Sequence, residues 1–457
     1  MELRESPLWQ EIRSIAFEQT AIPLLHSWKA EFLIKGQKFT PFKVISIEIL
    51  RDFLGAYGDE IILEVMIAAG DFVYDIYPNR QDLLISLTRE GRQRETDAPV
   101  FTQDIEAQQM RATLMDDHSV AVEGMRSVAH SKEAMNTMDI FTVKFQLLDL
   151  ALERVRLHSV GGIFIDSTTS GVLNYALTSV IGDMDLDEVN RIKGVEMIES
   201  PNTDTYKHIV IPHGTKLVEL PMLLQHKIGG IYPTGLGMYL FKQHWYVYPL
   251  FDLKRFDQTT KTLTLINVPT NQMPGIERTF RKTANQIIAL VTGEVKHKDL
   301  TEAMLLNQGN GVRFLDSRRV IDNFADTTAG ENKAVVMRAE NNSEFVTDER
   351  TSGLNNVQVA GPRITANKFA EMSKLARRTG SELQCLWENS DMGAIYPGMP
   401  VKYMYIRDNR IHELKGTVLG AQHYIQTHGK GMTDTRHRTD TALHLFVERE
   451  RAIEEVT

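Results

Sequence analysis

The stretch from Asn367 to Arg449 most constrains the fold, because it has the pattern of one amphipathic helix followed by several short alternating strands. Within 367–379 the apolar residues recur three to four positions apart, which is the period of a helix with one buried face. Gly380 stands where a glycine commonly ends a helix. Two strands with one apolar face each are expected next. Their alternating residues are Leu383, Cys385, Trp387, Val401, Tyr403 and Tyr405.

A turn and two further strands complete this region. Pro397 and Gly398 predict a tight turn at 396–400, because proline presets φ and glycine tolerates positive φ. The last two strands are expected at Gly416–Ile425 and Thr441–Arg449, joined by a polar loop.

The N-terminal part has a similar pattern. Runs of five to nine residues alternate or are wholly apolar, and turn residues separate them. This pattern indicates a sheet of hairpins rather than parallel strands joined by helices. The expected strands are 44–51, 59–67, 70–77, 83–89 and 138–148.

Between these regions the sequence predicts a mixed α/β segment. Residues 166–169 form a polar run that can cap a helix through 172–180, and a second helix is expected at 217–224. Residues 238–251 are dense in aromatic side chains and predict a hairpin that turns at Gln243 and His244.

The order of helix, strand, Pro-Gly turn and further strands in 367–449, ending in threonine, alternating apolar residues and arginine, resembles the tube-like β-barrel domain of contractile-tail baseplate hub proteins. The resemblance implies an α+β fold with two tube-like antiparallel β-barrel domains and an inserted α/β module. The implied divisions are an N-terminal helix with the first barrel at 1–158, the module at 159–253, a loop-rich segment that can hold early strands of the second barrel at 254–365, and the second barrel at 366–457.

The resemblance also implies a function. Hubs of this family are trimers that seat the cell-puncturing spike of bacteriophages, and two barrels per chain let three chains match a six-fold tail tube. The implied partners are a central spike protein, a tail tube or tube-initiator protein and other baseplate proteins, with DNA passing through the lumen. The chain is then expected in the virion baseplate, and in the host cytoplasm before assembly, as a structural protein without catalytic residues, cofactor or metal.

Composition agrees with a structural protein. A length of 457 residues suggests about three domains. The net charge of −9 argues against a protein that grips nucleic acid, which needs a basic surface. The single cysteine, Cys385, excludes an internal disulfide framework and is expected to be a small buried hydrophobe. The charged N-terminus argues against a signal peptide, and no apolar run approaches the roughly 18 residues of a membrane span, so no stable membrane association is expected.

Three partial motifs fall short of a catalytic or metal site. Asp183, Asp185 and Asp187 have calcium-loop spacing, but the turn glycine and the bidentate glutamate are missing, so a solvated acidic turn is expected. His412-Glu413 opens a zinc-protease motif whose second histidine would have to stand at Gly416. Gly235-Leu-Gly237 begins a dinucleotide-binding motif without its third glycine.

Histidines cluster in the last two expected strands and their loop, at His423, His428, His437 and His444. His423 and His444 could face each other across the hairpin and hold a metal with Asp434 or Asp440. The favoured interpretation is that they are polar strand and loop residues, because strand histidines need no metal.

Two further segments and two alternatives stay open. Polar linkers are expected at 92–106 and 325–361, and the aromatic hairpin at 239–251 is a candidate interface or the core of its own domain. A peptidoglycan hydrolase fused to a barrel is the enzyme alternative, but the carboxylates are too numerous to select a catalytic pair. A hub or spike component of a related secretion or injection system would share the fold.

Overall fold

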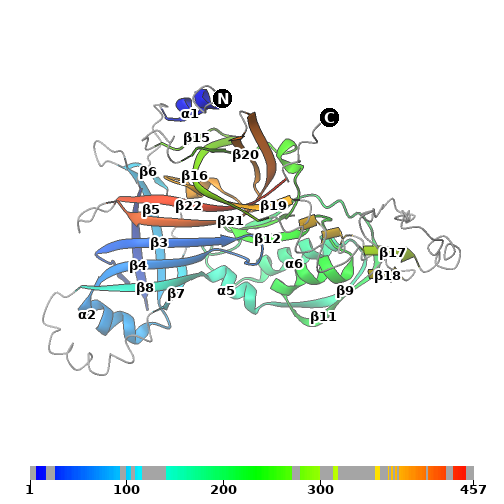
Figure 1. Ribbon diagram of the computed structural model, residues 1–457. Coiled ribbons are helices and arrows are strands. Elements are labelled where there is room, and N and C mark those ends of the chain that lie inside the picture. Colours follow the sequence, from blue (N-terminus) through cyan, green and yellow to red (C-terminus); the bar gives the residue numbers. More distant parts are fainter. Residues whose placement is uncertain are drawn as a thin grey trace.

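The protein is described from a computed structural model of the 457-residue chain. The structure describes residues 7–16, 26–92, 99–103, 109–115, 140–269, 278–298, 312–316, 356–360, 369, 372–373, 376–377, 380–407, 410–428 and 436–448. The fold is α+β and is dominated by one 15-stranded mixed sheet, with smaller sheets and helices beside it (Figure 1).

Strands from both ends of the chain form a first closed circuit of hydrogen-bonded neighbours. The pairing runs β1-β5-β7-β8-β4-β3-β21-β22 and returns from β22 to β1, and each of these pairings is antiparallel. The short strands β2 and β6 extend β1 and β5. The bounds are β1 His26–Ile34, β2 Gln37–Phe39, β3 Lys43–Asp52, β4 Glu60–Ala68, β5 Leu84–Arg92, β6 Pro99–Gln103, β7 Gln109–Leu114, β8 Ile140–Asp149, β21 Arg410–Thr427 and β22 Arg436–Glu448.

Apolar side chains from alternate positions of these strands pack into one core. Phe32 of β1 and Phe145 of β8 are fully buried, and their ring centroids lie 5.5 Å apart in an edge-to-face contact. Ile425 of β21 belongs to the same core, although the other members are N-terminal residues. Alternation along a strand therefore places one face in this core, where each large side chain contributes about 1.5–3 kcal/mol.

A second closed circuit uses the same two C-terminal strands. Its order is β22-β19-β16-β14-β20-β21, closed by the pairing of β21 with β22. β14 runs parallel to both β16 and β20, so this circuit is mixed and the expectation of a purely antiparallel structure is wrong here. The bounds are β14 Thr262–Asn267, β15 Phe280–Lys282, which pairs with β16, β16 Gln286–Lys298, β19 Gly380–Trp387 and β20 Pro400–Arg407.

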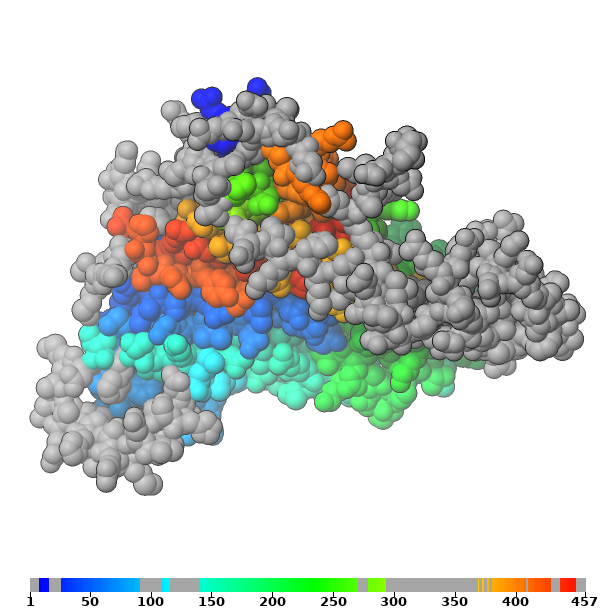
Figure 2. Space-filling model, viewed as in Figure 1, coloured from blue at the N-terminus to red at the C-terminus, as the bar shows by residue number. Residues whose placement is uncertain are grey.

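The two circuits share β21 and β22, and β21 changes neighbour along its length. Residues 410–417 of β21 pair with β20, and 420–426 pair with β3. Gly416 and Gly420 stand at this change of partner, where a Cβ atom would meet the backbone of Phe446 or the carbonyl oxygen of Arg51. Glycine allows this close approach because it lacks a side chain. Figure 2 shows the result, with the C-terminal strands lying directly against the N-terminal ones.

The middle of the chain forms an α/β module on one side of both circuits (Figure 1). In α6 the buried residues recur at helical spacing, and the Thr168 hydroxyl caps the helix by accepting from the Gly171 N–H at 3.1 Å, as expected. β9 pairs with β11, and β10 and β12 both pair with β13. The bounds are α5 Leu150–Leu157, β9 Ser159–Ser167, α6 Thr169–Asp183, β10 Gly194–Met197, β11 Tyr206–Lys216, η4 Leu217–Glu219, α7 Leu220–Leu223, η5 Leu224–Ile228, β12 Leu236–Phe241 and β13 His244–Pro249.

Short elements complete the fold. Helix α1 buries Leu8, Ile12 and Ile15 against the outer face of β14 and β16. None of the helices in the described ranges is long and apolar enough to cross a membrane. The remaining bounds are α1 Pro7–Ala16, α2 Ala69–Asp71, η2 Phe72–Ile76, η3 Tyr77–Asn79, η6 Arg255–Asp257, β17 Val312–Asp316, β18 Asn356–Ala360 and η9 Met392–Ala394.

Several expected elements differ from the observed ones. The segment 70–77, predicted to be a strand, is helical. Phe72 and Ile76, four positions apart, are buried, and Tyr74 between them is 60% exposed. In the sequence alone, this helical spacing of apolar residues resembles the alternation of a strand. Gly380 begins β19 instead of ending a helix, and the polar linker at 92–106 contains β6. The hairpin turns at Lys242 and Gln243, both at positive φ, rather than at Gln243 and His244.

Several predictions for the C-terminal region agree with the structure. Gly398 has φ +65, so the tight turn is confirmed. Leu383, Cys385 and Trp387 are buried as predicted. The described residues of 367–379 are helical, whereas most of 325–361 lies outside the described residues. β21 and β22 are longer than predicted.

Candidate functional site

A buried guanidinium connects both circuits to the α/β module. Arg51 of β3 is 3% exposed, and its Nε donates to the two oxygens of Asp59 at 3.1 and 3.2 Å. Its Nη1 donates to the Met392 carbonyl at 2.8 Å, in η9 of the second circuit's loop. Asp59 in turn accepts from the Tyr239 hydroxyl of β12 at 2.9 Å. Removing one partner of such an ion pair would leave the other charge buried and unpaired, which is costly. This network therefore holds the first circuit, the second circuit and the α/β module in one arrangement.

His423 of β21 extends the same network. Its Nε2 lies 3.1 Å from Arg51 Nη1, and its Nδ1 lies 2.7 Å from the Thr441 hydroxyl of β22. Arginine only donates, so Nε2 accepts and the proton is on Nδ1. Burial, together with the positive charge of Arg51, lowers the pKa of His423 well below its ordinary value. The imidazole is therefore a neutral hydrogen-bonding residue inside the strand pair that both circuits share.

A second buried cluster joins β1 and β5 to the loop before η9. Arg89 Nη2 donates to His26 Nε2 at 2.5 Å, and Arg89 Nη1 lies 3.5 Å from Asp391. Lys282 Nζ bonds the other oxygen of Asp391 at 2.9 Å. Burial, followed by the charge of Arg89, lowers the pKa of His26 to about 3. Burial by itself would raise the pKa of Asp391, but Arg89 and Lys282 outweigh it and lower this pKa to about 2.

The structure does not bring the predicted histidines together. His423 lies opposite Thr441 and His444 lies opposite Gly420, so the two imidazoles do not face each other. His444 contacts Glu382 at 3.3 Å. The suggested metal pairing is therefore wrong for these two residues. The other histidines are also placed individually: His437 Nε2 donates to the Val44 carbonyl at 2.9 Å, and His428 is exposed.

No group of three His, Cys, Asp or Glu side chains within the described ranges could hold a metal ion. Asp440 accepts from Arg438 and from the Asn389 N–H, and Asp434 lies outside the described residues. Asp183, Asp185 and Asp187 are exposed at the end of α6, as a solvated acidic turn would be. Burial raises the pKa of Cys385 to about 12, which agrees with a buried hydrophobe rather than a nucleophile.

The aromatic hairpin of β12 and β13 is a core element and not an open interface. Tyr239, Phe241 and Tyr248 pack into the core of the second circuit. Leu240 and Trp245 pack on the other side, into the core of the module. The sequence indicated the aromatic density but not that both faces are covered.

Exposed apolar residues concentrate elsewhere in the module. Ile163 and Ile165 of β9 are 66% and 64% exposed, and Val210, which lies opposite Ile163 on β11, is 57% exposed. The intervening Phe164 and Ile209 pack toward the module core. The three consecutive apolar residues at 163–165 place apolar side chains on both faces of this strand. The sequence alone could not say which of the two faces is exposed.

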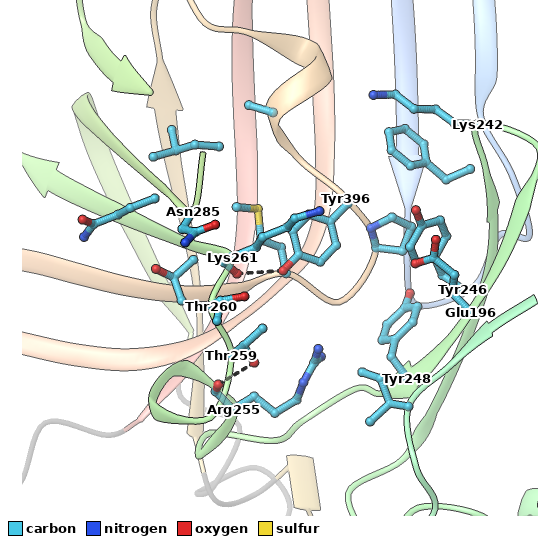
Figure 3. A pocket seen from close by; sticks show the side chains of 18 of the residues that line it. Glu196, Lys242, Tyr246, Tyr248, Arg255, Thr259, Thr260, Lys261, Asn285 and Tyr396 are labelled. Carbon is cyan, nitrogen blue, oxygen red and sulfur yellow. Dashed lines mark hydrogen bonds between the residues drawn. The ribbon is translucent and has the colours of Figure 1, made fainter. Parts of the chain in front are cut away.

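A cavity of about 580 Å³ opens between the module and the second circuit. In Figure 3, Lys242, Glu196, Tyr246 and Tyr248 form one side, and Tyr396 lies on the other. The remaining labelled residues, also on that other side, are Arg255, Thr259, Thr260, Lys261 and Asn285. The Tyr396 hydroxyl donates to the Lys261 carbonyl at 2.8 Å, and the Thr259 hydroxyl donates to the Arg255 carbonyl at 2.8 Å. These two hydrogen bonds fix the side of the cavity that Tyr396 and Arg255 form.

The chain is similar in structure to phage tail proteins over most of its length. A tail protein from Neisseria meningitidis is 12% identical, with 92% of this chain and 96% of that chain covered and a TM-score of 0.46. A 43 kDa tail protein of a Shewanella oneidensis prophage is 11% identical, with 92% and 96% covered and a TM-score of 0.45. A component of the type VI secretion system of E. coli is 9% identical, with 92% and 77% covered and a TM-score of 0.40. No family model matches the sequence, and no curated protein does.

Proposed function

We propose that this chain is a structural baseplate hub of a contractile phage tail, which adapts a six-fold tail tube to a three-fold central spike and lines the DNA channel. The observation that carries this proposal is the pair of closed strand circuits joined through β21 and β22. If each circuit is a tube-like barrel, one chain carries two barrels in a fixed relation. Three chains would then present six similar units to the tube.

The division of the chain follows from the same proposal. The first barrel takes most of its strands from 1–158, the inserted module occupies 159–253, and the second barrel draws on 254–365 and 366–457. The buried networks of Arg51 and Arg89 support a rigid relation between the barrels, because charged groups buried in well-made pairs resist rearrangement. A rigid double barrel is what a symmetry adaptor needs.

The β9–β11 ribbon supports assembly with other copies of the chain. Large exposed apolar residues that lie in register, as Ile163 and Val210 do, are typical of surfaces that another protein covers. We therefore place the contact between protomers of a homotrimer on this ribbon. Obligate contacts of this kind usually bury more than about 2,000 Å². The partners are then a spike protein, a tube or tube-initiator protein and other baseplate proteins, in the virion baseplate.

Native mass measurement of purified protein tests the homotrimer. The unchanged chain should give a mass of three copies, and Ile163→Glu should give single chains with an unchanged melting temperature. Tyr74→Glu is the matched control, because Tyr74 is 60% exposed at a distant helical segment. A single-chain mass at every concentration, including in the presence of the tube and spike proteins, would refute the trimeric hub.

Two further assays separate the hub from its rivals. A hub that lines the DNA channel should bind duplex DNA only weakly, with a dissociation constant above about 10⁻⁴ M at physiological salt, because tight phosphate contacts would hinder ejection. Tight, salt-sensitive binding in a gel-shift titration would contradict this. A clearing band on a cell-wall zymogram would instead support the hydrolase alternative and contradict a non-enzymatic role.

A further inference from the structure

The cavity between the module and the second circuit has an excess of positive charge, although the whole chain has a net charge of −9. Four cationic side chains line it, and one of them, Lys282, is held in an ion pair at 2.9 Å. The remaining three, Lys242, Arg255 and Lys261, form no ion pair within the described ranges. Among the described lining residues, Glu196 is the single carboxylate. Three unpaired cations against one carboxylate leave an excess of two positive charges, which an anionic ligand would complement.

Arg255 is the buried member of this set. It is 7% exposed, and its Nη1 donates to the Gly398 carbonyl at 2.6 Å. A guanidinium has five N–H donors, and this is the single hydrogen bond that the Arg255 side chain makes with the described part of the chain. In Figure 3 the side chain extends into the space between Tyr396 and Tyr248, so its other donors face the cavity. A buried cation without a counter-charge is costly, and an anion in the cavity would remove this cost.

The carboxylates beside Arg255 in the sequence are engaged elsewhere. Asp252 accepts the Lys254 N–H at 3.0 Å, and Asp257 pairs with Lys415 Nζ at 2.8 Å. Burial lowers the pKa of Arg255 from its ordinary value, and Asp252 and the nearby tyrosines offset this lowering only in part. The protein therefore supplies Arg255 with no full counter-charge of its own among the described residues.

Neutral donors accompany the cations on the Tyr396 side of the cavity. Thr260, Lys261 and Asn285 lie on this side in Figure 3, and their side chains make no hydrogen bond to the described residues. A carboxylate would bring one negative charge and two oxygens. A phosphate monoester brings a charge of about −1.5 to −2 and three strong acceptor oxygens. The charge excess and the number of open donors therefore favour phosphate over carboxylate.

We infer that the cavity binds a small phosphate monoester, with the phosphate on Arg255 and the organic group against the apolar part of the lining. Arg255 presents the planar fork that matches phosphate oxygens, and Lys261 adds a second positive charge. Ile198, Pro397 and Met399 belong to the apolar part of the lining. A volume of about 580 Å³ lies within the usual range of ligand sites. Nothing in this inference depends on the oligomeric state or on the role in a tail.

Isothermal titration of the full chain with phenyl phosphate, at constant ionic strength, tests the inference. Benzoate is the matched probe, because it has the same ring and a carboxylate in place of the phosphate. Phenyl phosphate should bind at least about tenfold more tightly than benzoate, because one further hydrogen bond between charged groups changes affinity by about that factor or more. Inorganic phosphate should also bind more weakly than phenyl phosphate, because it has no organic group to bury.

Variants of the chain locate the binding. Arg255→Met should weaken phenyl phosphate binding about 10- to 100-fold, because it removes the charged donors. Lys261→Glu should weaken it about fivefold or more, because repulsion replaces attraction. Lys261 is exposed, so this variant keeps the test decisive if Arg255→Met fails to fold. Lys227→Glu is the matched control, because it makes the same charge change at an exposed lysine outside the lining and should leave the affinity unchanged.

Four results would overturn the inference. The first is no binding of phenyl phosphate to the unchanged chain. The second is binding of benzoate that is equally tight, which would show that the cavity does not select phosphate. The third is equally tight binding of inorganic phosphate, which would show that no organic group is bound. The fourth is equal affinity of the Lys261→Glu and Lys227→Glu variants, which would place the ligand outside this cavity.

Discussion

The substitution Gly416→Ala tests the close approach of β21 and β22, the strand pair that both circuits share. A Cβ atom at Gly416 would overlap the Phe446 carbonyl oxygen and lie 2.8 Å from both the Phe446 carbonyl carbon and the Val447 Cα, where ordinary contacts begin at 3.4 Å. The obstacle is backbone, so no side chain can rotate away. Relief requires β21 to move from β22, which adds the cost of weakened ladder hydrogen bonds to the cost of overpacking.

The magnitude follows from these two costs. Overpacking in a closely packed region costs about 1–3 kcal/mol, and each lost hydrogen bond costs about 1 kcal/mol net. We expect Gly416→Ala to lower the free energy of unfolding by about 2–5 kcal/mol. In domains of 150–250 residues each kcal/mol lowers Tm by about 2–4 °C, so the melting temperature should fall by several degrees.

The control is Gly182→Ala in α6, where a Cβ atom would meet nothing within 4 Å. The same added methyl should there be neutral or stabilising by up to about 1 kcal/mol, because alanine favours a helix over glycine. Thermal melts and urea titrations of both variants give the comparison. Equal melting temperatures for Gly416→Ala and the unchanged chain would refute the close approach of the β22 backbone to Gly416.

Three further predictions concern buried groups. Burial lowers the pKa of His26 to about 3 and lowers the pKa of His423 well below its ordinary value, so the unfolded chain binds more protons than the folded chain below about pH 6.5. Stability should be complete above that pH and should fall as the pH drops below it, by at most about 1.4 kcal/mol per pH unit for each of the two histidines. The loss that His26 causes should level off near pH 3, and His423→Gln should flatten the slope in urea titrations. Cys385, whose pKa burial raises to about 12, should resist alkylation at pH 8 and react only in urea, and rapid labelling of the native chain would contradict its burial. Gly398→Ala should lower the free energy of unfolding by about 2–5 kcal/mol, because Gly398 has a positive φ and an added Cβ would lie 2.6 Å from Tyr248 Cγ. If Gly398→Ala costs as much in a chain that also carries Tyr248→Leu, the contact with the Tyr248 ring does not contribute to the cost.

The sequence alone determined many of the local elements. Alternation in β19 and β20 predicted which side chains face a core, because neighbouring side chains of a strand point to opposite faces. The polar run before α6 predicted its start, because only a few residue types can satisfy the free N–H groups of a helix terminus. Gly398 predicted a turn, because its positive φ is rare for other residues. These features depend on neighbours within a few residues.

Tertiary structure decided which strands are neighbours and what the polar residues do. Almost every residue type offers the same backbone N–H and C=O groups to a neighbouring strand. The sequence of β21 therefore does not indicate that its first half pairs with β20 and its second half with β3. The same holds for the parallel pairing of β14 on both sides. His423 became a partner of Arg51, some 372 residues away, and not of His444. Long-range packing thus selects among pairings that the local pattern leaves equivalent.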